Sequence, residues 1–403
     1  MVQLDFYGTL VAASLVLLLG RGLVTRVGFL RAYNIPEPVA GGLVVALLLL
    51  LLRGMGDMEV RIDTSLQAPL MLAFFATIGL SADFASLKKG GRNLAVFLLL
   101  VTGFLLVQNA MGIGLAKALG LDPLMGLLTG SVTLSGGHGT GGAWGAVFKE
   151  QYGLASAPEI AMASATFGLV LGGLIGGPVA RLLVKRVQTP GAVQGEPRLP
   201  RGYEQPYKER QITALSFIET LALVAIGLQA GSFLSGLIQG TALELPTFVC
   251  VLFVGVVLRN GLSALGWHQV FDQEVSLLGN VSLSLFLAIA LMSLRLWDLA
   301  SLALPILILL AVQTLVMALF AIFVTFRVMG RNYDAAVLAA GHCGFGLGAT
   351  PTAIANMQAV TQRYGPSPMA FLVVPMVGAF FIDISNAIVI KLYLALPWLG
   401  VAA

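Results

Sequence analysis

Long apolar segments follow one another along almost the whole of this 403-residue sequence, and few charges interrupt them. Charged residues make up 10% of the chain, whereas soluble domains carry about 25%. A membrane helix needs about 20 apolar residues. The sequence therefore predicts an all-α polytopic membrane protein with about ten transmembrane helices, near residues 6–24, 38–52, 68–80, 94–115, 160–184, 213–238, 246–265, 275–294, 301–326 and 366–396.

Two further apolar pieces, 124–147 and 335–359, are rich in glycine and are not counted as crossings. The first contains the run SGGHGTGGAW at 135–144, and the second contains GHCGFGLGATPTAIAN at 341–356. Irregular backbone survives at membrane depth only where protein or a water-filled cavity surrounds it. We expect each piece to be a re-entrant hairpin that enters and leaves the membrane on one side.

The distribution of Lys and Arg gives the expected orientation. With both termini outside, in the periplasm, the inner loops and helix ends hold most of the 23 basic residues, among them Arg21, Lys88, Arg181 and Lys185. Cytoplasmic loops carry such an excess. Counting either glycine-rich piece as a crossing would place every later loop on the opposite side, and the excess of basic residues in the inner loops would be lost. The first apolar segment is not expected to be a signal peptide, because Asp5 stands where a basic region should be.

Two halves of the chain resemble each other. A cytoplasmic linker rich in proline, glycine and charge, 188–211, separates residues 1–187 from residues 212–403. The matched positions, in the same order at offsets of about 205 to 215, are Glu37-Pro38 with Glu244-Leu-Pro246, Asp83-Phe-Ala-Ser-Leu87 with Asp298-Leu-Ala-Ser-Leu302, Gln108 with Gln313, and Asp122 with Asp334. Because each half has five crossings, an odd number, the second half must be inverted. Inverted-topology repeats with broken helices are an architecture of secondary transporters.

The first glycine-rich piece is a candidate anion site. Glycines leave backbone amides unshielded, and a helix that begins after the tip directs about half a positive charge at a ligand. Both features suit a carboxylate. Close helix packing through small residues is the alternative reading. The candidate substrate-binding residues here are Ser135, Gly136, Gly137, His138, Gly139 and Thr140.

The second glycine-rich piece and the last apolar segment are candidates for substrate and cation. Aligned on the repeated aspartates, His138 falls opposite Thr350, so we expect the two tips to approach from opposite faces and meet. Pro351 is expected to free a carbonyl for a cation such as sodium. Asp383 is an intramembrane carboxylate, which favours cation coordination over a structural ion pair. The candidates are Gly346, Gly348, Thr350, Thr352 and Asn356 for substrate, and Asp383, Ser385, Asn386, Gly348 and Thr350 for sodium.

Other classes of function are less well supported. A membrane enzyme is not indicated, because neither G-x-S-x-G nor H-E-x-x-H is present. A channel needs a continuous pore, whereas paired hairpins suit an occluded site with alternating access. The net charge of +4 does not indicate nucleic acid, because the basic residues follow the topology. A cation/proton antiporter that uses Asp383, and a sodium- or proton-coupled transporter of another small carboxylate, remain open.

Motifs that span nearly the whole chain resemble those of a known family. They are IPEPVAGG at 35–42, LMLAFFATIGL at 70–80, TLSGGHGTG at 133–141, TFGLVLGGLIGGPVAR at 166–181, ELPTFVCVLFVG at 244–255, GNVSLSLFLA at 279–288 and NYDAAVLAAGHCGFGLGATPTAIANMQA at 332–359. Through them the sequence closely resembles the bacterial sodium/glutamate symporter family. The linker is the part that least resembles it.

The resemblance implies sodium-driven uptake of L-glutamate across the bacterial inner membrane, with Na⁺ as coupling ion and no other cofactor. It also implies two inverted five-helix halves with re-entrant loops. By analogy with citrate-type transporters, it implies a homodimer and an elevator motion. For glutamate, we expect the amides of both tips and the hydroxyls of Ser135, Thr140, Thr350 and Thr352 to take the carboxylates. An oxygen near Asp383 or Asn356 would then take the ammonium or sodium.

Overall fold

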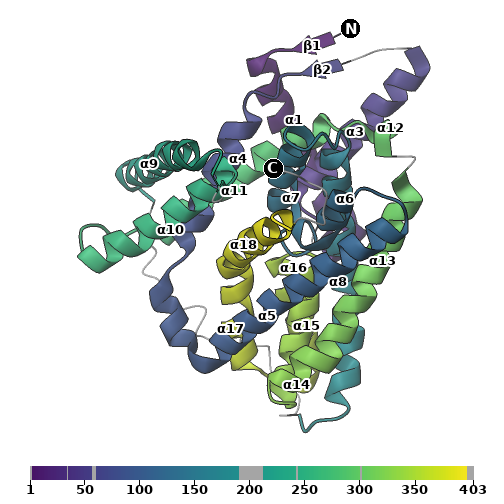
Figure 1. Cartoon of the computed structure of the whole chain (residues 1–403), viewed down its shortest axis with the longest axis vertical. Helices are drawn as coiled ribbons and strands as arrows, with labels where there is room; N and C mark the ends of the chain where they lie inside the picture. The colour runs from purple at the N-terminus through teal and green to yellow at the C-terminus, as the bar shows by residue number, and fades with distance from the viewer. Residues whose placement is uncertain are drawn as a thin grey trace.

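A computed structural model describes residues 2–33, 35–56, 60–189, 212–241, 244–299 and 302–396 (Figure 1). The expected helical architecture is found. The helices of the first half are α1 (Phe6–Arg26), α2 (Gly28–Ala32), α3 (Glu37–Gly56), α4 (Gln67–Ser81), α5 (Phe84–Ala118), α6 (Pro123–Leu127), the π-helix η1 (Leu128–Val132), α7 (Gly137–Glu150) and α8 (Ala157–Val184). The linker 188–211 lies almost entirely outside the described residues.

The second half is also helical. Its helices are α9 (Ala214–Ile238), α10 (Thr247–Leu265), α11 (Asp272–Met292), α12 (Leu296–Leu299), α13 (Ala303–Phe320), the π-helix η3 (Ala321–Thr325), α14 (Phe326–Val328), α15 (Tyr333–Leu347), α16 (Thr350–Tyr364), α17 (Pro368–Met376), the π-helix η4 (Val377–Phe381) and α18 (Ile382–Leu394). The sequence did not predict two short parallel strands, β1 (Val2–Leu4) and β2 (Val60–Ile62), which pair near the N-terminus.

Among the described residues, eight helical runs are long and apolar enough to cross a membrane. They are α1, α3, α5 from Gly91 onward, α8, α9, α10, α11 and the run from α13 to α14. Each coincides with a predicted crossing. The other two predicted crossings are helical but different in form: α4 has only 15 residues, and the last segment is divided into α17, η4 and α18. The chain is thus a polytopic helical membrane protein.

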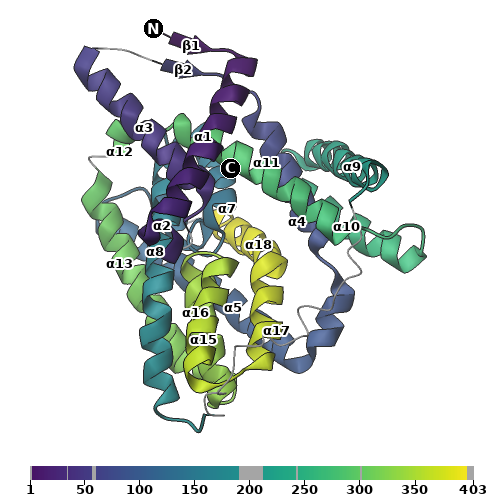
Figure 2. The same cartoon turned by 180° about the vertical axis from the view of Figure 1, so that it is seen from behind.

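The helices pack as two groups (Figure 1). The flanking group contains α1, α3, α4, α9, α10 and α11, which pack on one another. The central group contains α5 to α8 and α13 to α18, and from behind α15 to α18 lie beside one another (Figure 2). Between the groups, α7 contacts α11, α18 contacts α10, and η4 contacts α4.

Inside the central group, α8 and α15 approach so closely that their backbones touch. A Cβ on Gly168 of α8 would lie 2.0 Å from the carbonyl oxygen of Leu347, at the end of α15. No side chain fits at that distance, so Gly168 sets the position of α15 and of the turn that follows it.

Gly168→Ala should therefore push α15 away from α8. Overpacking of a tight contact costs about 1–3 kcal/mol, so we expect a lower midpoint of thermal unfolding in detergent. Gly177→Ala is the control in the same helix, because no atom lies within 4 Å of its Cβ position. Equal midpoints for the two variants would contradict the packing role of Gly168.

Candidate functional site

Two helical segments are interrupted at glycines deep inside the protein. The first broken segment, 123–150, leaves helical geometry at Gly130 (φ −102°, ψ −136°) and restarts as α7 at Gly137, whose φ is +66°. The second broken segment, 333–364, is interrupted at Gly348 (φ −145°, ψ −96°) and restarts as α16 at Thr350. The prediction that a helix begins after the first tip is confirmed, and the structure shows that one also begins after the second.

The two tips meet, as the sequence predicted. The hydroxyl of Ser135 lies 3.1 Å from the carbonyl oxygen of Gly346. A Cβ on Gly137 would lie 3.6 Å from the carbonyl oxygen of Gly348. The amino ends of α7 and α16 are thereby brought together from segments that lie more than 200 residues apart.

Four backbone amides remain open at these amino ends. Those of His138 and Gly139 in α7, and of Thr350 and Thr352 in α16, have no hydrogen-bond partner among the described residues. The first N–H groups of a helix lack intrahelical acceptors, and the helix dipole adds about half a positive charge there. The junction is therefore a strong site for a carboxylate.

Two predicted donors are not available. The amide of Gly136 donates to Ser131 (3.0 Å) and that of Gly137 donates to Thr133 (2.9 Å), so the prediction of open amides at these glycines is wrong. The reason is local: the chain closes tight turns before α7 begins, and these turns use both N–H groups.

His138 and Thr350, which the alignment of the two halves placed opposite each other, each hydrogen-bond a residue of a later helical segment. The separation along the chain is the same in both cases. His138 Nε2 lies 3.0 Å from Thr166 Oγ1 of α8, and the Thr350 hydroxyl donates to the carbonyl of Gly378 in η4 at 2.6 Å. Each partner lies 28 positions further along the chain. Thr166 donates to Met162 (2.8 Å), so His138 donates to Thr166.

The carboxylate of Asp383 reaches the first tip. Thr140 Oγ1 lies 3.5 Å from Asp383 Oδ1, which is long for a hydrogen bond. One helical turn further, Asn386 is fully buried, and its Nδ2 donates to the carbonyl of Ser131 at 2.8 Å. Ser385 is two residues from Asp383 and therefore points to a different face of α18, so the structure does not bring it to Asp383.

Buried side-chain atoms without a partner gather beside the first break. Among the described residues they include Ser131 Oγ, Asn386 Oδ1 and Asn109 Nδ2, and Thr352 Oγ1 is a further one in the first turn of α16. Buried polar atoms are nearly always hydrogen-bonded. Their presence at the candidate site supports a ligand-binding role for this region.

Two predicted roles need correction, and one predicted site residue has a second role. Asn356 lies well inside α16 and gives its amide hydrogens to Gly172 (2.9 Å) and Ala340 (3.3 Å), so it joins helices and does not reach the tip. Pro351 occupies the first turn of α16, where its missing N–H leaves no carbonyl free. Gly139 also serves packing, because a Cβ there would lie 2.5 Å from the ring of Phe74 in α4.

Residues outside the predicted set also support the tips. Gln108 and Asn109 of α5 bond both broken segments, and the Asn109 Oδ1 accepts from the amide of Ser131 at 2.9 Å. In the sequence analysis, Gln108 was used only as one of the matched positions of the two halves. The position of both residues in the middle of an apolar segment was the available signal. His342 lies in the second broken segment before its tip, and it is fully buried among the rings of four phenylalanines.

Two surface cavities, of about 650 and 340 Å³, lie elsewhere. One is lined by residues around Arg186 and Arg331, and the other by residues around Arg259 and Gln269; neither includes a tip residue. The chemistry therefore points to the enclosed junction of the tips and not to these surface hollows.

A polytopic helical protein with two broken segments that meet in its interior has the construction of a membrane transporter. The family model described as sodium/glutamate symporter matches residues 2–366, and the chain belongs to this family of transporters, which are not enzymes. The sodium/glutamate symporter of Escherichia coli (strain K12) is 67% identical over 98% of this chain and 99% of its own. That of Haemophilus influenzae is 54% identical over 96% and 97%.

Asn386→Ala should destabilise the protein, because it leaves the carbonyl of Ser131 without its donor. An unsatisfied buried group costs about 1–3 kcal/mol, measurable as a lower midpoint of thermal unfolding. Ser385→Ala, one position away, should change stability by less than about 0.5 kcal/mol, as substitutions away from such contacts do. A larger effect at Ser385 than at Asn386 would contradict the assigned contacts.

Proposed function

We propose that this protein takes up L-glutamate by sodium-coupled symport across the bacterial inner membrane. The observation that carries the proposal is the meeting of two helix amino ends with four open amides. An amino acid with two carboxylates is the ligand that two such ends suit. The names of relatives at 67% and 54% identity support the same substrate and ion.

The carboxylates of glutamate bind at the amino ends of α7 and α16. The donors are the amides of His138, Gly139, Thr350 and Thr352, with the hydroxyls of Thr140 and Thr352 beside them. Thr352 Oγ1 is buried and has no partner among the described residues, which supports this role. Ser135, Gly136 and Gly137 shape the first tip, and Gly346 and Gly348 shape the second.

Sodium binds where open oxygens face the tips. Asp383 supplies a carboxylate beside Thr140, and Asn386 Oδ1 has no partner among the described residues. The carbonyl oxygen of Gly348 accepts no hydrogen bond from the described residues, and it lies beside Gly137. Sodium in proteins is a hard cation that prefers such oxygens, and unwound backbone in transporters supplies them.

The architecture we propose is two inverted repeats of five transmembrane helices, residues 1–187 and 212–403, joined by a cytoplasmic linker, with both termini in the periplasm. Each repeat has a re-entrant hairpin, near 124–147 and 335–359, before its last helix. Matching helix contacts support it: α1 packs on α3 as α9 packs on α10, and α5 packs on α18 as α13 packs on α8.

Transport then proceeds by an elevator motion in a homodimer. The central group carries the tips and moves against the flanking group. The division of the helices into these two groups supports the motion. A sodium- or proton-coupled transporter of another carboxylate, or a cation/proton antiporter, would give different results in the first experiment below.

Purified protein in proteoliposomes should take up labelled glutamate when sodium is high outside, and a proton gradient alone should not drive uptake. Gradients of the two ions are imposed separately, and potassium replaces sodium in the control vesicles. An uptake rate that does not depend on the sodium gradient would contradict symport. Conversion of glutamate into another compound would indicate an enzyme.

Thr352→Val keeps the shape of the side chain and removes the unpartnered hydroxyl. Losing one hydrogen bond to a carboxylate should raise the KM for glutamate by about tenfold, because such a bond contributes about 1.5 kcal/mol or more. Thr361→Val is the control in the same helix, where the hydroxyl bonds only Met357 (3.0 Å) and Gln358 (3.3 Å). An unchanged KM for Thr352→Val would refute this contact.

Asp383→Asn removes the carboxylate from the sodium site and keeps its size. We expect the sodium concentration for half-maximal uptake to rise at least tenfold, because a neutral amide attracts the cation less strongly. The same measurement on Glu219→Asn, on α9 of the flanking group, is the control. Unchanged sodium dependence in the Asp383 variant would remove this residue from the site.

A further inference from the structure

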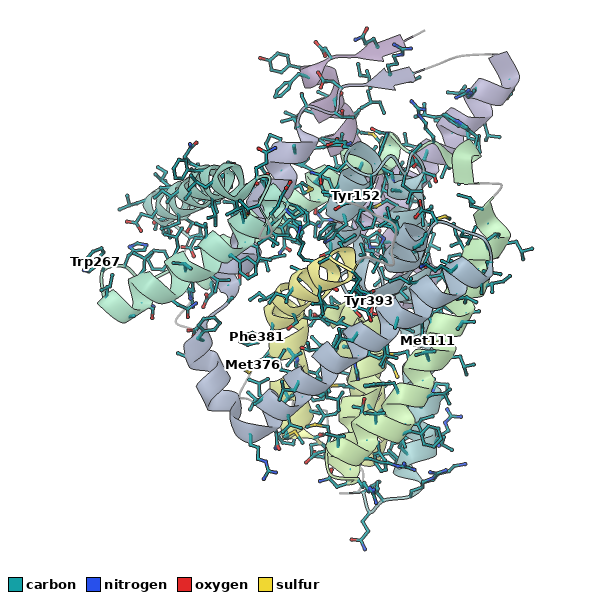
Figure 3. The ribbon with its side chains drawn as sticks, in the orientation of Figure 1. Met111, Tyr152, Trp267, Met376, Phe381 and Tyr393 are labelled. Atoms are coloured by element: carbon teal, nitrogen blue, oxygen red, sulfur yellow. The ribbon has the colours of Figure 1, made fainter. Side chains whose placement is uncertain are left out.

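Gln108 lies at the middle of α5, the long helix that runs across the central group (Figure 3). Its side chain is fully buried. Figure 3 labels Met111, one turn further along α5, and Tyr393 of α18, whose hydroxyl donates to the carbonyl of Leu106 at 2.7 Å. This stretch of α5 is therefore held between α18 and the two tips.

The amide of Gln108 bonds both tips. Its Nε2 donates to the carbonyl of Gly346 in the second tip at 3.0 Å, and its Oε1 accepts from the hydroxyl of Ser135 in the first tip at 2.7 Å. The backbone carbonyl of Gln108 also accepts from Gln313 Nε2 of α13 at 2.8 Å. Gln108, in α5, thus connects both broken segments with each other and with α13.

The geometry explains why an amide is required at this place. Gly346 lies in the last turn of α15, where carbonyls have no intrahelical donor. Inside a membrane such a group must find a partner in the protein. Gln108 offers a donor to that carbonyl and an acceptor to Ser135, which neither a carboxylate nor an ammonium side chain does at once. A hydroxyl can donate and accept, but only from a single atom, whereas the amide does so from two atoms.

We propose that Gln108 is a positioning residue: it holds the two tips in the one arrangement that binds glutamate and sodium, and it touches neither. The proposal rests on the proposed function and deepens it. It also reassigns Ser135, whose hydroxyl hydrogen is directed at Gln108 and Gly346, from a carboxylate ligand to a residue that acts through Gln108.

The expected consequence is a loss of affinity without a loss of maximal rate. When the tips are no longer tied, only a fraction of the molecules has the competent arrangement, and the apparent dissociation constant rises by the inverse of that fraction. Glutamate and sodium bind the same arrangement, so both apparent affinities fall together. A merely structural residue would lower the amount of folded protein, and hence the maximal rate, at constant KM.

Gln108→Leu and Gln108→Asn test this. Leucine fills most of the space without polar atoms, and asparagine keeps the amide on a shorter side chain. With each variant, the KM for glutamate and the half-saturating sodium concentration should rise by about tenfold, as the loss of two ordinary hydrogen bonds gives, while the maximal rate per folded molecule stays within about twofold. Thr102→Val is the control on α5, since that hydroxyl bonds only Leu98 (2.9 Å).

Combining Gln108→Leu with Ser135→Ala separates the two roles of Ser135. If Ser135 acts through Gln108, the rise in KM for the double variant is smaller than the product of the two single rises, because neighbours in one network are not additive. A full product, an unchanged KM in both Gln108 variants, or a lower maximal rate at constant KM would overturn the proposal. Wild-type protein that does not take up glutamate with sodium would overturn the proposed function instead, before any variant is compared.

Discussion

Every backbone N–H and C=O group inside hydrocarbon needs a partner within the protein, and this requirement governs how the two helices are broken. At the first break, Asn109 accepts from the amide of Ser131 and Asn386 donates to its carbonyl. At the second, Gln108 donates to the carbonyl of Gly346, which has no donor within its own helix. Side-chain amides from α5 and α18 thus replace the bonds that the interrupted helices lose.

Glycines serve two different purposes in the packing. Within each helix group they let backbones touch: Gly168 lies against the carbonyl of Leu347, and a Cβ on Gly79 of α4 would lie 2.2 Å from the carbonyl of Leu252 in α10. Between the groups, Gly139 and Gly142 of α7 instead face aromatic rings, those of Phe74 and Phe286. A backbone contact fixes a helix in its register, whereas a ring against a glycine forms a smooth surface with no directional bond. The close approaches at these two glycines between the groups are therefore to side chains and not to backbone.

The sequence predicted the helices well because apolar length is a local property, and eight predicted crossings coincide with helices that can span a membrane. It also predicted that both tips are broken and that they meet, because the glycine clusters and the matched aspartates, Asp122 and Asp334, can be found in the sequence alone. It did not predict the β1–β2 pair, which depends on Val2 and Val60 meeting through the fold. It assigned Asn356 to the site and used Gln108 only to align the two halves, since the direction in which a buried amide points depends on its neighbours. The prediction of open amides at Gly136 and Gly137 was wrong for a similar reason. Both N–H groups donate to carbonyls of the preceding turns, which the sequence did not predict.

The side chains that support both breaks are all uncharged: Gln108, Asn109, Ser135, Gln313 and Asn386. A neutral framework does no electrical work when it moves through the membrane field. A charge that crosses that field exchanges about 2.3 kcal/mol per 100 mV. In the part of the chain that the structure describes, the carboxylate beside the tips is that of Asp383. The side chains that hold the two breaks therefore contribute no charge on which the membrane voltage could act, and the side chain beside the tips that could contribute one is Asp383.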